Sequence, residues 1–312
     1  MEKSKSLRFA SKIIIITVIM LVFCVLGHVL YRSYSKSMSN ASYIDKLNRL
    51  EAMKDENKAV FVGGSATHFG IHSKYFEEKT GIPSVNMGLN AGTSFGLYIN
   101  SVKPYMKPGD ILFLMPEYGY YGEGWYNDTD NNVEFLLYYA PETIKRTPAS
   151  ALLKYLPTAL TVGWKNFGFY FQDSIRKKLS KNKVYLRSSS NEYGDMTVHE
   201  NLPPDKFADS VYDFENYPFI DKLEENIKYF EDMGVKVYLL FPPLNRTSFE
   251  QSEKCADGIY QRLSDDNVKM LYKPEDSAYE NDKFFDTVYH LKYESGIEFT
   301  DMIIEKLASE EN

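Results

Sequence analysis

The longest apolar segment of the chain is residues 13–31, which contain no formally charged side chain. An apolar helix of about 20 residues spans the hydrocarbon core of a bilayer. Basic side chains gather in residues 1–12, and such a flank favours the cytoplasmic side. The pattern predicts a cytoplasmic tail at 1–12, an uncleaved transmembrane helix at 13–31, and a cell-membrane protein whose C-terminal domain is extracytoplasmic. A cleaved signal peptide is the alternative, but its apolar core is typically shorter, at about 7–15 residues.

Beyond residue 58, short apolar runs alternate with amphipathic segments. The runs that predict buried strands are residues 59–64, 83–88, 109–118 and 235–244. Residues 73–81 and 219–234 predict helices that each end at a glycine. Strands that alternate with helices favour right-handed βαβ connections and a parallel sheet. The predicted fold class is α/β, a three-layer domain with a doubly wound parallel sheet.

The alternation stops after the third predicted strand. Residues 118–215 are rich in aromatic and polar side chains, and the simplest interpretation is an insertion at one end of the sheet, where functional loops usually lie. Residues 32–57 are polar with scattered apolar positions, which predicts a stalk. The expected domain therefore covers 58–312, with the insertion at about 118–215.

Charge and cysteine usage exclude several classes of function. The formal net charge is −7 although the tail is basic, so the predicted outer domain is acidic and has no electrostatic reason to bind nucleic acid. The two cysteines are Cys24, inside the apolar run, and Cys255. They allow no disulfide within the outer domain and no cysteine-based metal site. Metal-ligand spacings and phosphate-binding glycine motifs are also missing from the sequence, so neither a metal nor a cofactor is expected.

The candidate chemistry begins where the first predicted strand ends. Ser65 lies in the stretch FVGGSATHFG. The serine is either a helix cap or a nucleophile at a strand end. A nucleophilic serine needs a base, and His290 is the histidine with an acid placed to orient it, because Asp286 precedes it by four residues. The alternative is an acid and a histidine on a solvated loop.

In order and place, these residues resemble the SGNH/GDSL hydrolase family. The resemblance covers roughly residues 58–118 and 220–308. It implies a flavodoxin-like three-layer fold in which Ser65 is the nucleophile, His290 the base and Asp286 its acid. It also implies that Gly88, after the second strand, donates its amide to the oxyanion.

Two departures from the family pattern concern the oxyanion and the acid. Where the family has an asparagine donor after the third strand, this chain has Glu117, and a carboxyl group donates a hydrogen bond only when it is protonated. We expect Asn90 or the backbone amides of Ser65 and Gly88 to take over; a site adapted to another reaction, or an inactive one, is the alternative. The spacing from Asp286 to His290 is also one residue longer than the common form.

Aromatic side chains follow the third predicted strand, at the edge where doubly wound sheets bind ligands. They are candidates for stacking on sugar rings, with ordinary packing of the insertion as the alternative. Asn245 follows the fourth strand near the same edge. The predicted substrate-binding residues are Tyr118, Tyr120, Trp125 and Asn245.

One membrane span followed by an SGNH-like domain is similar to family members that modify cell-surface polymers. That resemblance implies a serine acyltransferase or esterase acting on O-acyl groups of a cell-envelope polysaccharide, with a multispanning membrane-bound O-acyltransferase as partner. A catalytically inactive scaffold or glycan-binding component is the alternative from a different class of protein.

Overall fold

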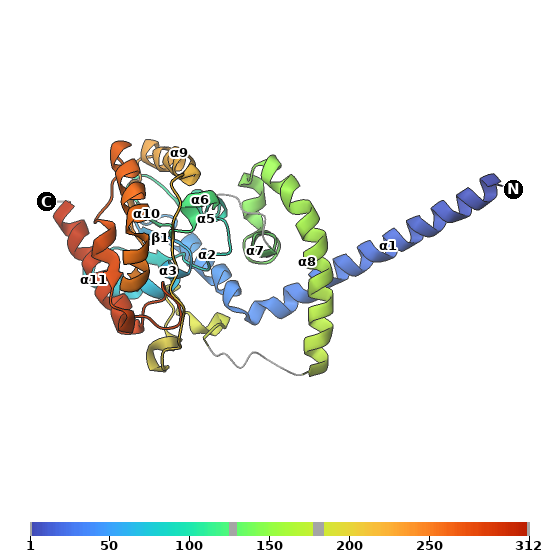
Figure 1. Ribbon diagram of the computed structural model, residues 1–312, viewed down its shortest axis with the longest axis horizontal. Coiled ribbons are helices and arrows are strands. Elements are labelled where there is room, and N and C mark those ends of the chain that lie inside the picture. Colours follow the sequence, from blue (N-terminus) through green and yellow to red (C-terminus); the bar gives the residue numbers. More distant parts are fainter. Residues whose placement is uncertain (1, 125–129, 177–183, 311–312) are drawn as a thin grey trace.

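The computed structural model describes residues 2–124, 130–176 and 184–310. The N-terminal helix α1 (Glu2–Tyr34) projects from the rest of the protein (Figure 1). The side chains of residues 6–22 are exposed. In the described part of the chain, this is the one helix that is long and apolar enough to cross a membrane.

A four-stranded parallel sheet forms the centre of the domain, so the protein is mixed α/β. Its spatial order is β2-β1-β3-β4, and every neighbouring pair is parallel. The strands are β1 (Ala59–Gly63), β2 (Ser84–Asn86), β3 (Ile111–Met115) and β4 (Lys236–Leu239). The prediction of a parallel sheet from alternating strands and helices is confirmed. A separate parallel pair joins β5 (Leu244–Asn245) to β6 (Ala278–Tyr279).

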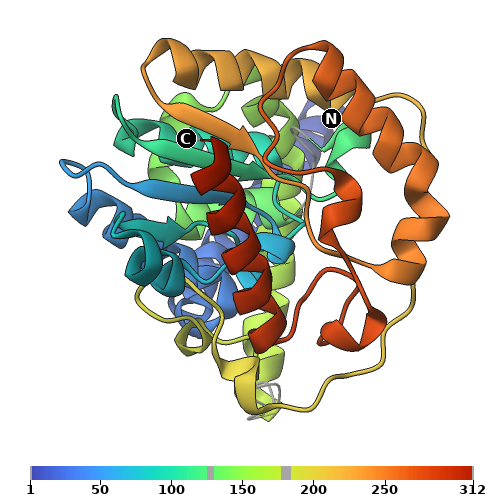
Figure 2. The same cartoon turned by 90° about the vertical axis from the view of Figure 1, so that its left-hand side faces the viewer.

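Helices surround the sheet. Helix α11 (Tyr293–Glu310) lies across the front of it in Figure 2. The other helices of the predicted α/β alternation are α3 (Ser65–Gly70), α4 (Ser73–Thr80), α5 (Phe95–Val102), α9 (Pro218–Asp232) and α10 (Arg246–Asp265). Strands β1 and β3 are buried along their whole length, as parallel strands covered on both faces require. At their centre the rings of Phe61 and Phe113 stack with centroids 4.6 Å apart.

The amino ends of the two central strands are held by a buried ion pair. Lys58 Nζ lies 2.8 Å from Asp110 Oδ2, and both side chains are fully buried. Asp110 also accepts hydrogen bonds from the backbone N–H groups of Lys58 and Lys107. The buried charges are therefore paired and hydrogen-bonded, which such a site requires.

The segment predicted as a stalk is instead largely part of the domain. Helix α2 (Ser42–Ala52) buries Tyr43, Lys46 and Leu50, and the hydroxyl group of Tyr43 is hydrogen-bonded to Ser101 at 2.7 Å. The prediction failed because these positions share one face of a helix, while one of them is a lysine that looks solvent-exposed in a sequence. The boundary at residue 58 was therefore too late.

The insertion contains helices α6 (Tyr120–Glu123), α7 (Asp130–Glu134) and α8 (Ala149–Arg176). Helix α8 crosses α1 rather than lying on the sheet (Figure 1). The tract from residue 184 onward returns to the domain, where Asp195 accepts hydrogen bonds from the backbone N–H groups of Ser73 and Lys74. The insertion thus contacts both the sheet domain and the apolar helix α1.

The Lys58–Asp110 pair should matter far more to stability than an exposed pair. Asp110→Ala leaves a buried ammonium group without its partner, so we expect the free energy of unfolding to fall by about 3–5 kcal/mol. The matched control is Glu51→Ala, whose partner Lys54 is about half-exposed; its loss should cost under about 1 kcal/mol. Denaturant unfolding of the detergent-solubilised protein measures both, and equal losses would contradict the prediction.

Candidate active site

The site is built on the parallel register of β1 and β3. Gly63 pairs with Met115 at the carboxyl ends of these strands. Ser65 and Glu117 each follow two residues later, so the register brings them together. Gly63 itself has no room for a side chain, because an added Cβ would lie 1.9 Å from Thr67 Oγ1 and 2.6 Å from the carbonyl oxygen of Met115.

Glu117 holds the hydroxyl group of Ser65. Ser65 Oγ donates to Glu117 Oε1 at 3.2 Å, and the backbone N–H of Ala66 donates to the same oxygen at 2.8 Å. The carboxyl group is buried. Burial raises the pKa of Glu117, although these hydrogen bonds oppose the shift. A carboxyl group that keeps its proton more readily than usual therefore lies against the candidate nucleophile.

The other half of the site is a rigidly held histidine. His290 Nδ1 lies 2.7 Å from Asp286 Oδ1, and Tyr185 donates its hydroxyl proton to Asp286 Oδ2 at 2.6 Å. Burial alone would raise the pKa of Asp286, but the hydrogen bonds from His290 and Tyr185 lower it overall. The imidazole ring also stacks on Phe69 with centroids 4.0 Å apart and planes 2° apart. These contacts fix its orientation.

Ser65 and His290 line one cavity of about 420 Å³, a size typical of small-ligand sites. The hydroxyl group of Ser65 donates to Glu117, so the nucleophile must turn from Glu117 to reach the imidazole. The cavity brings together residues that are far apart in the sequence. Its other lining residues are Ala91, Glu117, Gly119, Tyr120, Ser210, Tyr212, Thr287, Val288 and Tyr289.

The two predicted oxyanion donors are engaged elsewhere. The N–H of Gly88 donates to the side chain of Asn86 at 2.9 Å, and the side-chain amide of Asn90 donates to Asn40 at 3.1 Å. Neither residue lines the cavity. Gly88 is needed for packing, since an added Cβ would lie 2.4 Å from the backbone nitrogen of His68. The structure therefore does not place Gly88 and Asn90 as predicted.

The predicted substrate-binding residues separate into two groups. Tyr120 lines the cavity, and its hydroxyl group donates to the carbonyl oxygen of Thr93 at 2.7 Å. Tyr118 and Asn245 are buried away from it, so a sugar ring cannot stack on Tyr118, and ordinary packing is the correct interpretation for both. The side chain of Asn245 donates to Asp209 and Asn281. Trp125 lies outside the described residues.

Sequence reasoning did not select Glu117, Tyr212 or Tyr185 as site residues. For Glu117 a signal existed, because residues that follow paired parallel strands by the same number of positions lie side by side. Tyr212 and Tyr185 belong to the insertion, and no spacing pattern in the sequence indicates that they return to the sheet.

A buried lysine of α2 contacts α3, the helix that begins at Ser65. Lys46 Nζ is hydrogen-bonded to His68 Nδ1 at 2.8 Å and to the carbonyl oxygen of Gly88. Burial lowers the pKa of Lys46 to about 7, although the charge of Asp195 opposes the shift. Burial likewise lowers the pKa of His68, with the charge of Lys46 acting in the same direction. This network joins α2 to helix α3 and to the loop after β2.

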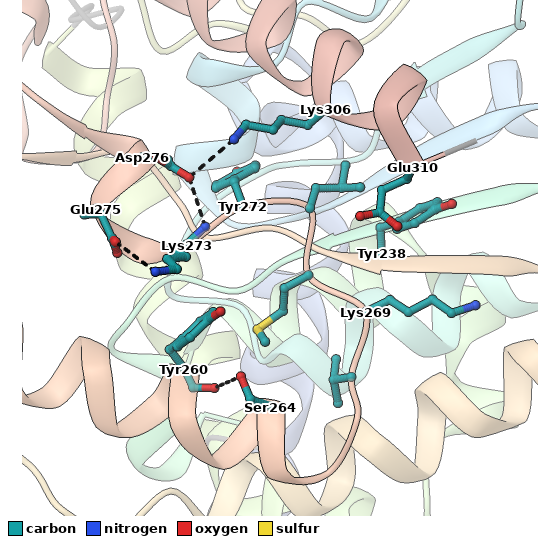
Figure 3. Close-up of a pocket in the computed structure, with 13 residues that line it drawn as sticks. Tyr238, Tyr260, Ser264, Lys269, Tyr272, Lys273, Glu275, Asp276, Lys306 and Glu310 are labelled. Atoms are coloured by element: carbon teal, nitrogen blue, oxygen red, sulfur yellow. Dashed lines mark hydrogen bonds and ion pairs between the residues drawn. The ribbon is translucent and has the colours of Figure 1, made fainter. Parts of the chain in front are cut away.

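A larger cavity, of about 750 Å³, lies elsewhere in the domain (Figure 3). Two of its lysines are paired with acids, Lys273 with Glu275 at 3.7 Å and Lys306 with Asp276 at 3.6 Å. Its one serine donates to a backbone carbonyl oxygen, and no histidine lines it. This cavity therefore lacks the combination of a serine and a histidine that lines the smaller one.

Neither the models of known protein families nor the curated proteins compared with this chain give a match. In the described residues, no group of three or more histidine, cysteine or acidic side chains is placed to hold a metal ion. The class that the fold defines is a mixed α/β protein with a four-stranded parallel sheet and one apolar helix able to cross a membrane.

Because the pKa of Lys46 is lowered in the folded protein, we expect the free energy of unfolding to depend on pH. In the unfolded chain this lysine keeps its proton up to about pH 10. Between about pH 7 and 10 the unfolded state thus binds more protons, and this residue's contribution to stability rises with pH, by on the order of 2 kcal/mol between pH 7 and 9. Lys46→Met should remove that rise.

The measurement is the melting temperature of the detergent-solubilised protein across this pH range, with the variant compared to the wild type at each pH. Lys228→Met, which removes an exposed lysine of α9 paired with Asp232, is the control and should keep the rise. Identical pH profiles for the wild type and Lys46→Met would show that Lys46 stays protonated in the folded protein.

Proposed function

We propose that the protein is a membrane-anchored serine acyltransferase or esterase of the SGNH type, acting outside the membrane on O-acyl groups of a cell-envelope polysaccharide. The observation that supports this most strongly is the cavity shared by Ser65 and the hydrogen-bonded pair His290–Asp286. In this proposal the parallel sheet belongs to a doubly wound, three-layer SGNH domain with an insertion.

The proposed reaction follows from how His290 is held. With Nδ1 hydrogen-bonded to Asp286, Nε2 is the atom that takes a proton. Ser65 Oγ attacks the acyl carbonyl carbon and gives its proton to His290, and Asp286 stabilises the imidazolium. The proton then passes to the leaving oxygen as its bond to the acyl carbon breaks, which forms acyl-Ser65. A sugar hydroxyl or water deacylates it by the reverse sequence.

Glu117 provides the hydrogen-bond donor in this scheme. Its buried carboxyl group lies against Ser65, and its pKa is raised by burial. When protonated, it can donate to the oxygen of the tetrahedral intermediate; when ionised, it repels that oxygen. The glutamate thus takes the role that the resemblance assigns to an asparagine, in its protonated form only.

The proposed polysaccharide substrate and the proposed partner protein are inferred from the order of the apolar helix and the domain along the chain. One apolar helix able to cross the membrane precedes the domain, as in the SGNH members that modify surface polymers. The substrate is therefore a cell-envelope glycan, and the partner that supplies acyl groups is a multispanning membrane-bound O-acyltransferase.

The second candidate function is a non-catalytic glycan-binding or scaffold component. It is favoured by the engagement of Gly88 and Asn90 in other hydrogen bonds and by the hydrogen bond from Ser65 to Glu117 rather than to His290. In that case the hydroxyl group of Ser65 only ties the start of α3 to Glu117, and the cavity binds sugar without breaking a bond.

Labelling with a fluorophosphonate probe separates the two functions. For an enzyme, intact-mass analysis should show one adduct on the full-length protein, which disappears in Ser65→Ala. His290→Ala should slow labelling by about 10²–10⁴-fold, because the general base is lost. Ser210→Ala removes the other serine that lines the cavity and should keep the adduct. Labelling that survives in Ser65→Ala, or is absent from a folded wild type, would rule out the proposed nucleophile.

The role of Glu117 is tested by its pH dependence. If the protonated form is the donor, activity toward p-nitrophenyl acetate falls as the pH rises through the raised pKa. Glu117→Gln keeps a donor at every pH and should abolish that fall, whereas Glu117→Ala should lower kcat by about 10²–10³-fold. Equal losses in both variants would instead indicate that the carboxylate acts as a base.

A further inference from the structure

Helix α8 presents a row of apolar side chains to solvent. Leu153 is 70% exposed, Leu156 59%, Leu160 43%, Trp164 39% and Phe171 53%. They recur every three to seven residues, so they form one stripe along the helix. The opposite side of α8 faces the domain, where Tyr155, Val162 and Asn166 are buried. An apolar stripe of this length is costly to leave in water.

The stripe is continuous with the apolar surface of α1. The two helices touch at Gly27 and Gly163, where a Cβ added to Gly27 would lie 1.9 Å from the carbonyl oxygen of Gly163. Close approach through glycines is typical of helix pairs in membranes. Beside this crossing, Phe23 of α1 packs its ring against Trp164 with centroids 5.9 Å apart.

The crossing point has a defined depth. Lys12 and Arg32 are the charged residues nearest to the apolar run on either side. The helical rise over the 20 residue steps from one to the other is about 30 Å, the thickness of the hydrocarbon core. Gly27 is five residues before Arg32 and so lies about 7–8 Å below that level. Amphipathic helices in the membrane interface are buried by about 5–10 Å.

The insertion also supplies hydrogen-bond partners for a polar side chain of α1 at the same depth. His28 Nδ1 is hydrogen-bonded to the hydroxyl group of Tyr138 at 2.5 Å, and Nε2 to the carbonyl oxygen of Ala159 at 2.9 Å. A histidine inside a membrane segment needs such partners. The contact between α1 and α8 is therefore formed at membrane depth.

We infer that α8 lies in the outer interface of the membrane, with its apolar stripe against lipid acyl chains. Because α8 crosses α1 (Figure 1), a membrane-spanning α1 places α8 along the surface, with the stripe on the side away from the domain. Lys154 and Lys165 are exposed on α8; Lys165 is paired with Asp130 at 2.6 Å, so Lys154 is the lysine of the two that the inference assigns to lipid phosphates. The inference rests on α1 crossing the membrane and is independent of the chemistry at Ser65.

The chain supplies its own probe, because Trp164 is in the stripe and the sequence contains only two tryptophans. The full-length Trp125→Phe variant is reconstituted into phosphatidylcholine vesicles with and without bromine on the upper part of the acyl chains. Contact with lipid predicts that bromine lowers the fluorescence of Trp164 by roughly half or more, and that aqueous iodide has little effect.

The matched control carries its single tryptophan on α9, as Tyr229→Trp combined with Trp125→Phe and Trp164→Phe. Tyr229 is 47% exposed, and α9 lies on the far side of the domain from the projecting part of α1 (Figure 1), so iodide and not bromine should quench a tryptophan there. If Trp164 behaves like this control, the stripe faces water and the inference is wrong. If neither reagent quenches Trp164, protein covers the stripe, either a second copy or another membrane protein in a co-reconstituted sample, and the inference is equally wrong. The same measurement on the wild-type protein, which contains both tryptophans, checks that the substitutions do not change the result.

Discussion

The pairing of β1 with β3 is the constraint on which the rest of the site depends. Parallel strands in register carry the chain past the edge of the sheet side by side, so that Gly63 opposite Met115 makes Ser65 a neighbour of Glu117. A shift of one residue would turn each side chain to the opposite face. The buried Lys58–Asp110 pair at the other end of the same strands helps to fix that register.

Near the carboxyl ends of β1 and β3, burial shifts the pKa of an acid and the pKa of a lysine in opposite directions. Burial raises the pKa of Glu117, which contacts Ser65. Burial lowers the pKa of Lys46, which contacts His68 of α3, to about 7. Both groups therefore favour their neutral forms in the folded protein more than they do in water. By contrast, hydrogen bonds from His290 and Tyr185 lower the pKa of Asp286 and so favour its ionised form.

The sequence predicted features that depend on continuous apolar runs. The parallel sheet and the apolar N-terminal helix are confirmed, and Ser65 and His290 line one cavity as expected of them. The predictions failed for residues whose role depends on which group they contact in the folded protein. Gly88 does not have its expected role because its N–H donates to Asn86. Tyr118 is a core residue because, in the turn after β3, its ring packs against Tyr212 and Phe241. The burial of Lys46 and the position of α8 depend on contacts with distant segments. The local pattern of the sequence does not show such contacts.

The packing of α2 against the domain removes the flexible tether that would otherwise follow the membrane helix. Tyr43 and Leu50 anchor α2 in the core, and Arg187 holds Asp45 with two hydrogen bonds of 2.6 and 2.7 Å. A domain on a loose tether samples a wide shell of heights and orientations, whereas a fixed one samples a single height. The cavity that Ser65 and His290 line is therefore held at a set distance and orientation relative to α1.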